Sequence, residues 1–569
     1  MYLDFLVEIP EVKGKITKKK KGDTVYVNYE IGRTYNSERK YNVPERKAIG
    51  KVSKSDPTKM VPNEYFLMYF PEVELPDERF NSERSSCLSI GAYIIIQKIL
   101  DEYHIPELLE GYFSPKDLGL FLDLLAYSIV CENNAAQYYP SYAYGHPLFT
   151  EGMHIYSDSK ISDFFSSMTG EESVGFLNDW NAKCDHREKI YISYDSTNKN
   201  SEAGDIEMVE FGAAKVDVGA PIFNYSIAYD TNNSKPLFYE TYLGSIADIS
   251  QLEFMLGKAK GYGYKNIGFI LDRGYFSKHN IIMMDKYGYD FVIMIKGMSS
   301  LVDSLILKHK GEFEEERKYS IRRHHVYGKT IKEKLYADDE KDRYFHLYHS
   351  TGKEHGEKET LEDTLERMRK IIEAQYGTRY ELSDAEEKYF EPFYDSEGVL
   401  VVAKEKDDVI KQELRLCGYF VLVTSDKMSA SDAIDLYYSR DASEKLFRGD
   451  KSYLGNKSMR VYTSESTDAK IFIEFVALIV RNRIYTLLKE EVEKIDGSPN
   501  YMTVPAALRE LEKIEMIRGH DRIYRLDHAI TKTQKVILKA FDIDTNYVKH
   551  RANRISEQLK IADGIRGGK

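Results

Sequence analysis

Three short, continuous apolar segments constrain the fold of this chain more than any other feature. They are Ile267–Leu271, Phe291–Ile295 and Tyr419–Val423. A run of four to eight apolar residues without polar alternation is typical of a strand that is buried on both faces of a sheet. Helices are expected to follow the first and third runs, from about Ser277 and from about Ser431. The pattern therefore predicts an α/β protein with a central mixed sheet flanked by helices.

The length of 569 residues indicates several domains, because a compact domain usually holds about 100–200 residues. Changes of pattern along the chain give the expected boundaries. We expect a β-rich N-terminal region at 1–80, a helical domain at 86–185, the first part of the core at 186–300, an inserted charged domain at 301–415, the second part of the core at 416–485 and a helical C-terminal domain at 486–569. Within the first part of the core, strands are expected at 190–194, 206–218, 222–230 and 236–243.

Composition excludes several classes of protein. Hydrophobic residues make up 42% and charged residues 30%, which is typical of a chain that buries an ordinary core. No apolar run reaches the ~18–20 residues of a membrane span, and the acidic start without a basic leader predicts a cytoplasmic protein with no membrane contact. The four cysteines lack metal-finger spacing, so we expect reduced and mostly buried thiols.

The net charge of −12 argues mildly against a protein that coats a polyanion, but nucleic-acid binding depends on local charge. The run Lys18–Lys21 followed by Gly22 and Asp23 is the densest local cluster of cations near the N-terminus. A solvated hairpin loop and a contact with a DNA backbone both remain open for it.

Two aspartates stand where predicted strands end. Asp195 follows the strand at 190–194, and Asp272 follows Ile267–Leu271. In open α/β sheets, sites form outside the carboxyl ends of the strands, and a carboxylate there is costly unless it is paired. Either residue alone would also fit a cap, a turn or, for Asp272, a local ion pair with Arg273.

A third group of polar residues lies in the helix expected after Tyr419–Val423. Tyr437, Arg440, Glu444 and Lys451 have the spacing Y-x2-R-x3-E-x6-K. At ~100° per residue they fall within a ~60° sector of one helix face. A solvated stripe would give the same spacing, but this face directly follows a buried strand, and the opposite face is apolar.

Together these residues indicate phosphoryl transfer on a nucleic acid. Asp195, Asp272 and Glu444, with no matching cysteine or histidine cluster, form a set of oxygen ligands that suits Mg²⁺ or Mn²⁺. Such a set can hold two ions ~3.5–4 Å apart that act on one phosphodiester. Arg440 and Lys451 are then candidate phosphate clamps.

At this point the residues resemble the DDE transposases of bacterial insertion sequences, of the insertion-sequence-four type. The Y-R-E-K signature of that family is met in full by Tyr437, Arg440, Glu444 and Lys451. Tyr194–Thr197 and Leu271–Tyr275 resemble the regions of its two aspartates, and the resemblance runs from about residue 90 to about residue 485.

The resemblance implies a ribonuclease H-like core with an insertion between the second aspartate and the glutamate. It implies Asp195, Asp272 and Glu444 as catalytic ligands of two Mg²⁺ ions, for which Mn²⁺ substitutes. Tyr437, Arg440 and Lys451 would bind the terminal phosphates of the DNA. The implied reaction is cut-and-paste transposition, with cleavage at the terminal repeats and strand transfer to target DNA by a homodimer at the bacterial nucleoid.

Two other functions remain open at this stage. One is a non-catalytic DNA-binding repressor derived from a transposase, and the other is a stand-alone ribonuclease H-like nuclease. Two features stay without an assigned role: Trp180 fits the core better than a base-stacking site, and Arg322–His325 fits a DNA-backbone contact as well as a solvated strand edge.

Overall fold

The computed structural model describes residues 2–3, 5–37, 40–54, 56–73, 84–184, 189–201, 206–212, 220–296, 298–454, 458–495, 497, 499–519 and 523–562. They form two compact units. One consists of Met1–Glu172 with Ile471–Lys569, and the other of Ser173–Lys470.

The N-terminal part of the first unit is an antiparallel sheet with the strand order β1-β5-β4-β3-β2. This confirms the predicted β-rich region. Val27, Ile49, Met60 and Phe66 form its core. The elements are β1 (Val7–Glu8), β2 (Ile16–Lys21), β3 (Thr24–Asn36), β4 (Tyr41–Val52), β5 (Lys59–Pro62) and α1 (Glu64–Tyr69). Lys18–Lys21 lie in the edge strand β2 rather than in a loop.

The rest of the first unit is mainly helical, and α17 and α19 from the end of the chain pack on α2. Its sequence pattern did not predict the small sheet in which β18 pairs with both β6 and β19. The elements are β6 (Cys87–Ser89), α2 (Gly91–Glu102), α3 (Ile105–Leu109), α4 (Pro115–Cys131), α5 (Tyr139–Tyr144), α6 (Asp158–Ser167), α17 (Val504–Leu511), β18 (Glu515–Arg518), β19 (Tyr524–Leu526), α18 (Lys532–Lys539) and α19 (Thr545–Ala562). By sequence, α7 (Glu171–Ala182) and α16 (Ser464–Val492) cross the boundaries between the units.

The second unit is built on a nine-stranded mixed sheet with the order β12-β13-β14-β17-β11-β10-β7-β8-β9. The strands are β7 (Ile190–Asn200), β8 (Ile222–Asp230), β9 (Lys235–Leu243), β10 (Ile267–Leu271), β11 (Asp290–Met294), β12 (Ser320–Ile321), β13 (Val326–Lys334), β14 (Asp342–His349) and β17 (Tyr419–Thr424). β10 runs parallel to β7 and β11, whereas β8 and β9 are antiparallel. The five strands from β11 to β9 have the arrangement of a ribonuclease H-like fold, so the predicted fold class is confirmed.

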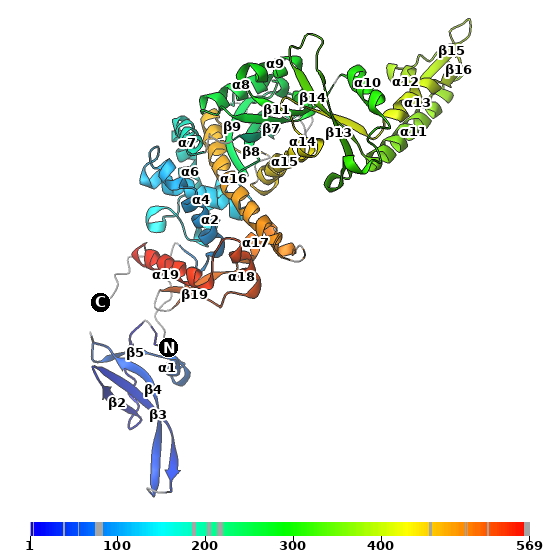
Figure 1. Ribbon diagram of the computed structural model, residues 1–569. Helices are drawn as coiled ribbons and strands as arrows, with labels where there is room; N and C mark the ends of the chain where they lie inside the picture. Colours follow the sequence, from blue (N-terminus) through cyan, green and yellow to red (C-terminus); the bar gives the residue numbers. More distant parts are fainter. Residues whose placement is uncertain are drawn as a thin grey trace. The chain divides into compact units, whose positions relative to one another are not determined.

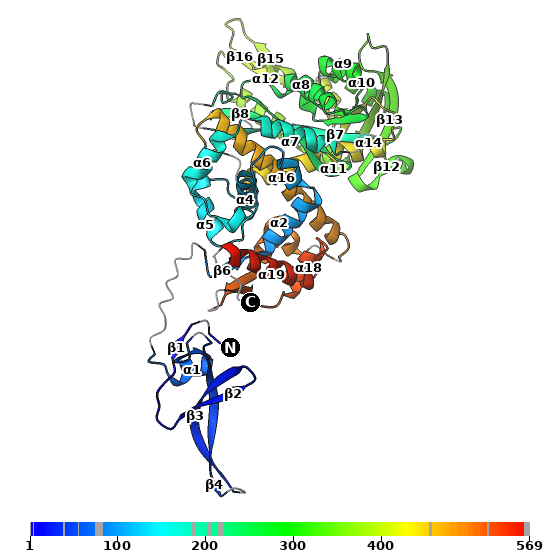
Figure 2. The ribbon, with the colours of Figure 1, turned by 90° about the vertical axis from the view of Figure 1, so that its left-hand side faces the viewer.

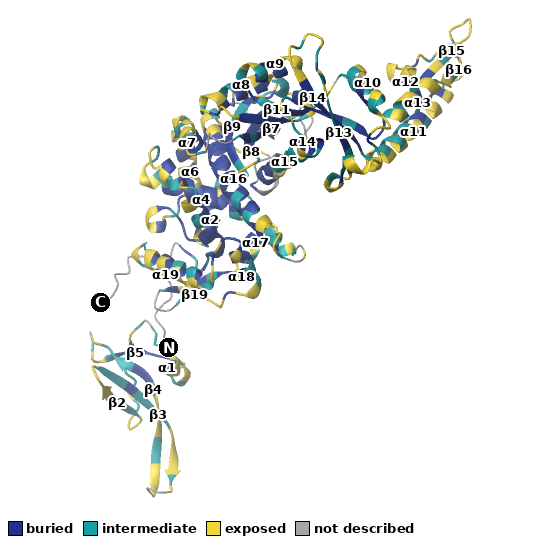
Figure 3. Cartoon of the chain, viewed as in Figure 1, coloured by how far each residue is buried: buried dark blue, intermediate teal, exposed yellow. Residues whose placement is uncertain are grey.

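Helices cover both faces of this sheet, as Figures 1 and 2 show from two directions. α8 (Asp248–Gly261) and α9 (Lys278–Tyr287) lie on one face, and α14 (Ala430–Tyr438) and α15 (Asp441–Arg448) on the other. The predicted helix starts are confirmed, because Ser277 and Ser429 cap α9 and α14 with their side chains. The sheet between the helices is shielded from solvent, and every residue of β8 and β10 is buried (Figure 3).

The charged stretch that we expected as an insertion has two parts. β12, β13 and β14 extend the central sheet, because residues Tyr344 to His349 of β14 pair with the whole length of β17. The following elements pack around a separate core that contains Leu365, Phe390 and Leu400. They are α11 (Thr351–Glu373), α12 (Asp384–Tyr389), β15 (Phe390–Tyr394), β16 (Leu400–Glu405) and α13 (Asp407–Leu416), while α10 (Ser299–His309) precedes β12.

Two local predictions are wrong. A strand was expected at 206–218, but the described residues 206–212 form a turn with one isolated bridge, Glu210 to Ile222, and 213–219 lie outside the described residues. The cysteines were expected to be mostly buried, but only Cys417 is buried, whereas Cys131 at the exposed end of α4 is accessible. The hydrophobic pattern predicts neither the turn at 206–212 nor the exposure of the cysteines. Both depend on where a helix or strand ends and the chain continues at the surface.

The expectation that Trp180 belongs to the core is confirmed. Its side chain is 4% exposed, and its indole N–H donates to the carbonyl of Pro236 at 3.0 Å. No helix in the described part of the chain has the length and apolar character that crossing a membrane requires.

Candidate active site

The two predicted aspartates lie side by side on neighbouring parallel strands. Leu271 of β10 pairs in register with Tyr194 of β7, so Asp272 and Asp195 occupy the next position of each strand. Asp195 was expected to follow the end of its strand, and this is wrong. β7 continues to Asn200 because β8 pairs with it along this whole segment. Asp195 therefore lies inside β7, at the level where β10 ends.

A hydrogen bond connects the two aspartate segments. Asp272 precedes the short 3-10 helix η3 (Arg273–Tyr275). The hydroxyl of Tyr275 donates to Oγ of Ser196, the neighbour of Asp195, at 3.0 Å. Tyr275 is 3% exposed, and burial raises the pKa of its hydroxyl, which keeps the group a neutral donor. Sequence reasoning included Tyr275 in the second aspartate motif but gave it no role.

The four residues predicted on one helix are divided among α14, the turn that follows it, α15 and a π-helical turn. α14 ends at Tyr438, α15 begins at Asp441, and Lys451 lies in a π-helical turn, η6 (Gly449–Tyr453). The prediction of one continuous helix is therefore wrong. Ser439 tightens the turn between the helices, because its hydroxyl donates to the carbonyl of Leu436 at 2.6 Å.

Arg440 brings two of the three predicted carboxylates together. Its Nη1 lies 2.5 Å from Oδ1 of Asp272, and its Nη2 lies 3.0 Å from Oε1 of Glu444. The guanidinium is 17% exposed and lies 5.2 Å from the ring centre of Tyr437, which is buried. Burial alone would lower the pKa of Arg440, but Tyr437, Asp272 and Glu444 raise it, so the side chain stays charged. The arrangement neutralises two acids that would otherwise repel each other.

A buried ion pair joins the helical segment of Glu444 to the strand of Asp195. Nζ of Lys199 on β7 lies 2.8 Å from Oδ2 of Asp450 in η6, and each side chain is only 1% exposed. Lys199 also lies 4.6 Å from the ring centre of Tyr225 on β8. Half-buried Lys451 directly follows Asp450. Sequence reasoning missed this pair, because a lysine in a buried strand signals the need for an acid but does not say which one.

Residues of the Arg322–His325 cluster hold the other end of this helical segment. Nη1 of Arg323 lies 3.2 Å from Asp435 on α14, and Nε2 of His324 lies 2.6 Å from the same carboxylate. The ring of His324 also lies against Tyr438, with 4.9 Å between the centroids. These contacts fix the helix that carries Tyr437, while the side chain of Arg323 is still 75% exposed.

The donor chemistry of the site fits a hard divalent cation. Asp195, Asp272 and Glu444 offer only carboxylate oxygens, which Mg²⁺ and Mn²⁺ prefer. Within the described ranges, no three acidic, histidine or cysteine side chains converge closely enough to hold a metal ion. Between Asp272 and Glu444, the charge that a cation would supply comes from Arg440.

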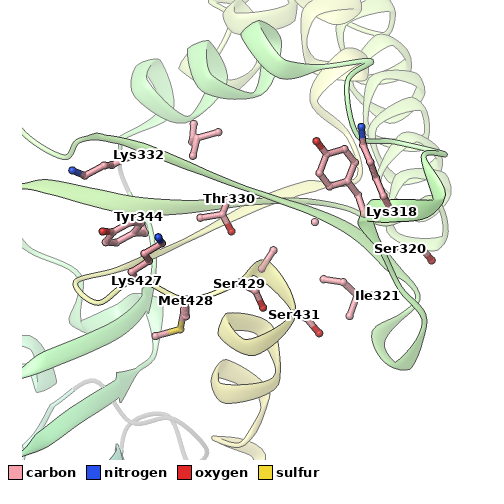
Figure 4. Close-up of a pocket in the computed structure, with 14 residues that line it drawn as sticks. Lys318, Ser320, Ile321, Thr330, Lys332, Tyr344, Lys427, Met428, Ser429 and Ser431 are labelled. Carbon is pink, nitrogen blue, oxygen red and sulfur yellow. The ribbon is translucent and has the colours of Figure 1, made fainter.

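A separate cavity of about 770 Å³ lies at the N-terminal end of α14. Figure 4 shows Lys318, Lys332 and Lys427 around it, with Ser429 and Ser431 from the start of the helix. None of the six predicted site residues lines this cavity. It is therefore distinct from the site that Arg440 organises at the C-terminal end of α14.

Part of this chain is similar to a known protein family. Residues 213–480 match the family model of the transposase DDE domain. The matched span contains Asp272, Tyr437, Arg440, Glu444 and Lys451, and it begins after Asp195. The match supports a DDE transposase.

Solved transposase structures show distant similarity. One is the piggyBac transposase synaptic complex with hairpin DNA, with 8% identity, coverage of 85% of this chain and 80% of that chain, and a TM-score of 0.32. Another is the Mos1 transposase paired-end complex with the left transposon end, with 10% identity, coverage of 40% of this chain and 65% of that chain, and a TM-score of 0.14. No curated protein sequence matches the chain significantly.

Proposed function

We propose that this chain is a metal-dependent DNA transposase of the cut-and-paste type. It binds the terminal repeats of its element, cleaves the DNA at the element boundary and joins the freed 3′-hydroxyl to target DNA. The observation that carries the proposal is the contact of Arg440 with both Asp272 and Glu444 beside Asp195. The match of residues 213–480 to the transposase DDE domain supports it.

In this proposal, Asp195, Asp272 and Glu444 bind two Mg²⁺ ions, and Mn²⁺ replaces them. Such ions activate the attacking oxygen and stabilise the leaving oxygen of a phosphodiester. The fixed spacing of the first two carboxylates comes from the register of β7 and β10. The position of Glu444 comes from its ion pair with Arg440 and from the anchoring of η6 by Lys199.

Arg440 and Lys451 supply positive charge to the phosphates of the DNA in this proposal. With Asp272 and Glu444 engaged as metal ligands, the guanidinium of Arg440 would be able to bind a phosphate with two N–H groups. We propose that Tyr437 positions this guanidinium, because its buried ring lies directly beneath it. A direct contact of Tyr437 with DNA stays a prediction from the resemblance.

The partners in this proposal are the terminal repeats and a target duplex. Because both ends of an element must be cut and joined together, we propose a homodimer in the synaptic complex. The reaction takes place on chromosomal DNA, which places the protein at the bacterial nucleoid.

The test is a cleavage and joining assay with the full chain. A labelled duplex that spans the element boundary and a supercoiled target plasmid are incubated with Mg²⁺, Mn²⁺ or EDTA. The variant Glu444→Gln is compared with Asp441→Asn, an exposed acid on the same helix. We expect metal-dependent nicks at the boundary and joined products for the parent and for Asp441→Asn, and neither for Glu444→Gln.

Other outcomes identify the alternatives. Nicking of DNA junctions or other structures without any joined product would indicate a stand-alone nuclease. Binding to the element end without nicking in either metal would indicate a repressor.

A further inference from the structure

The N-terminal sheet contains a long two-stranded extension. β2 covers β3 only along Thr24–Tyr29, and β5 covers β4 only along Gly50–Val52. Farther along, the two long strands pair only with each other, through five residue pairs from Gly32–Glu45 to Asn36–Tyr41. We name residues 32–36 and 41–45 the ribbon. Figures 1 and 2 show it projecting beyond the rest of its sheet.

The ribbon has no hydrophobic core. The structure describes all ten of its residues, and none of them is buried. The two largest apolar side chains, Tyr35 and Tyr41, are 64% and 53% exposed, and Figure 3 shows the ribbon as mostly exposed. An isolated two-stranded hairpin is at best marginally stable in water. A surface of this kind is therefore expected to gain its stability from a binding partner.

The ribbon is anchored at its base. Glu30 is 7% exposed and accepts a hydrogen bond from Nε of Arg33 at 2.6 Å, while Arg46 lies 3.6 Å from its other oxygen. The hydrogen bond from Arg33 lowers the pKa of Glu30, so this carboxylate remains charged. The anchoring fixes the direction in which the ribbon leaves the sheet.

The side chains of the tip are suited to reading base edges. Residues directly opposite each other in an antiparallel pair share a face, so Tyr35 and Asn42 lie on one face and Asn36 and Tyr41 on the other. Each face thus combines a flat amphipathic ring with an amide. Asparagine can donate to and accept from adenine in the major groove at the same time, and tyrosine can contact the phosphates.

Charge favours DNA as the partner. Residues 1–73 contain 14 lysines and arginines against 10 acidic residues, whereas the whole chain has 80 against 92. Lys18–Lys21 are all exposed on the edge strand β2. Lysines on an edge strand also prevent pairing with other chains, so this run alone does not decide the question. The lysines and the exposed polar ribbon belong to the same cationic sheet. Together they favour DNA as the partner, because a polyanion neutralises the surplus positive charge of the sheet.

The dimensions agree with this partner. The major groove of B-DNA is about 12 Å wide and admits a two-stranded β-ribbon. Five residue pairs at ~3.4 Å per residue give a ribbon of ~17 Å, which spans about half a turn of the duplex.

We propose that the ribbon enters the major groove of the element's terminal repeat and reads its sequence, while Lys18–Lys21, which pair with the opposite end of β3, contact phosphates farther along the duplex. The identity of the DNA rests on the proposed function, whereas the mode of recognition rests on the ribbon itself.

The test measures binding of the full chain to the element-end duplex and to a scrambled duplex of equal length. Tyr35→Ser with Asn42→Ala alters one face, and Asn36→Ala with Tyr41→Ser alters the other. The control is Met68→Ala, which changes a 69% exposed side chain on α1. We expect each ribbon variant to lose selectivity for the element end by roughly tenfold to a hundredfold, the usual discrimination by one or two base contacts. Binding to the scrambled duplex and all properties of the control should stay unchanged.

A second variant tests the lysines. Lys18→Gln with Lys20→Gln should weaken binding to both duplexes alike. It should also reduce the dependence of log Kd on log salt concentration by about one for each phosphate that a lysine no longer neutralises. An unchanged salt dependence would remove the lysines from the interface.

The outcomes separate this inference from the proposed function. Ribbon variants that select and nick the element end like the parent would overturn the ribbon inference and leave the transposase proposal intact. Loss of selectivity in the ribbon variants, together with no nicking by the parent in Mg²⁺ or Mn²⁺, would support the ribbon and overturn the transposase proposal. A change of oligomeric mass without a change in DNA binding would overturn the ribbon inference in favour of a protein partner.

Discussion

The central sheet and the N-terminal ribbon handle polar side chains in opposite ways. In the sheet, charged groups are paired with one another before any substrate arrives: Arg440 contacts Asp272 and Glu444, and Lys199 contacts Asp450 with both side chains 1% exposed. In the ribbon, Tyr35, Tyr41 and Asn42 are exposed, and none of its ten residues is buried. The first region has its geometry fixed by the fold, and the second is suited to acquire its geometry on a partner.

This difference agrees with the two tasks that we propose. Phosphoryl transfer requires groups placed to within a fraction of an ångström, which only a rigid environment provides. Recognition of a sequence tolerates local ordering upon binding, because the partner supplies the missing contacts. Substitutions should therefore affect the two regions differently.

The largest expected effect separates catalysis from binding. Asp195→Asn, Asp272→Asn or Glu444→Gln should each reduce strand cleavage by about three orders of magnitude, because one ligand of a metal-stabilised transition state accounts for several kcal/mol. Affinity for the element end should remain within about twofold, since the fold and the ribbon are intact. Cleavage rates and binding isotherms of the same preparations measure both. If a variant lost binding and cleavage to the same extent, the proposed division between a catalytic sheet and a DNA-binding ribbon would be contradicted.

The next effect concerns the buried pair. Lys199→Met should destabilise the protein by about 3–5 kcal/mol, because Asp450 would lose its buried counter-charge. Lys199→Met with Asp450→Leu should regain most of this stability. Lys20→Met on the exposed strand β2 is the matched control and should change the stability by less than about 0.5 kcal/mol. Urea unfolding measures the stability of all three variants. If Lys199→Met alone were as stable as the parent, this result would contradict the positioning role of the pair.

Arg440→Lys sharpens the account of the site itself. A lysine keeps the charge but cannot bridge two carboxylates with separate N–H groups. Cleavage should slow by roughly tenfold to a hundredfold, the usual cost of losing a residue that orients metal ligands. Lys445→Ala, an exposed cation on the same helix, should cleave like the parent. Parental rates for Arg440→Lys would show that a single point charge is sufficient.

The smallest effect is a pH dependence within the sheet. His346 on β14 is fully buried between Thr330 and Thr424, and burial lowers its pKa to about 4. The folded state keeps this ring neutral, whereas the unfolded chain binds a proton near pH 6.5. The contribution of His346 to stability is therefore present above pH 6.5 and is lost as the pH falls towards 4.

Thermal unfolding at pH 7 and pH 5 measures this contribution. The parent should lose more stability between the two values than His346→Gln does. His104→Gln replaces a histidine that is 64% exposed and should behave like the parent. Identical losses in the parent and in His346→Gln would contradict the burial argument.

Local patterns predicted the strands and helix starts of the core, but not the partners of each element. Continuous apolar runs identified β10, β11 and β17, and the helices expected from about Ser277 and Ser431 correspond to α9 and α14. The pairing of β14 with β17 was not predicted, because contacts between residues 70 to 80 positions apart, from His349 with Tyr419 to Tyr344 with Thr424, have no local signature. The ribbon was not predicted for the same reason. It exists because β3 and β4 extend beyond their neighbours β2 and β5, and this depends on which strands pair.

The candidate site was predictable in its residues and not in its geometry. Spacing and the family resemblance selected Asp272, Arg440 and Glu444, which the structure brings together. Neither indicated that Arg440 would bridge the two acids, that the helix would be interrupted at Ser439, or that Lys199 would anchor the segment after it. These features depend on tertiary packing around β7.

The central claim is that the carboxylate of Asp272 contacts a catalytic metal ion. Asp272→Cys tests it most directly, because a thiolate is a poor ligand for Mg²⁺ and a better one for the softer Mn²⁺. The measurement is nicking of the element-end duplex by this variant in each metal, beside the parent. The account predicts that the parent nicks in both metals and that the variant is inactive in Mg²⁺ and regains part of its activity in Mn²⁺. Nicking at the parental rate by Asp272→Cys in Mg²⁺ would contradict it.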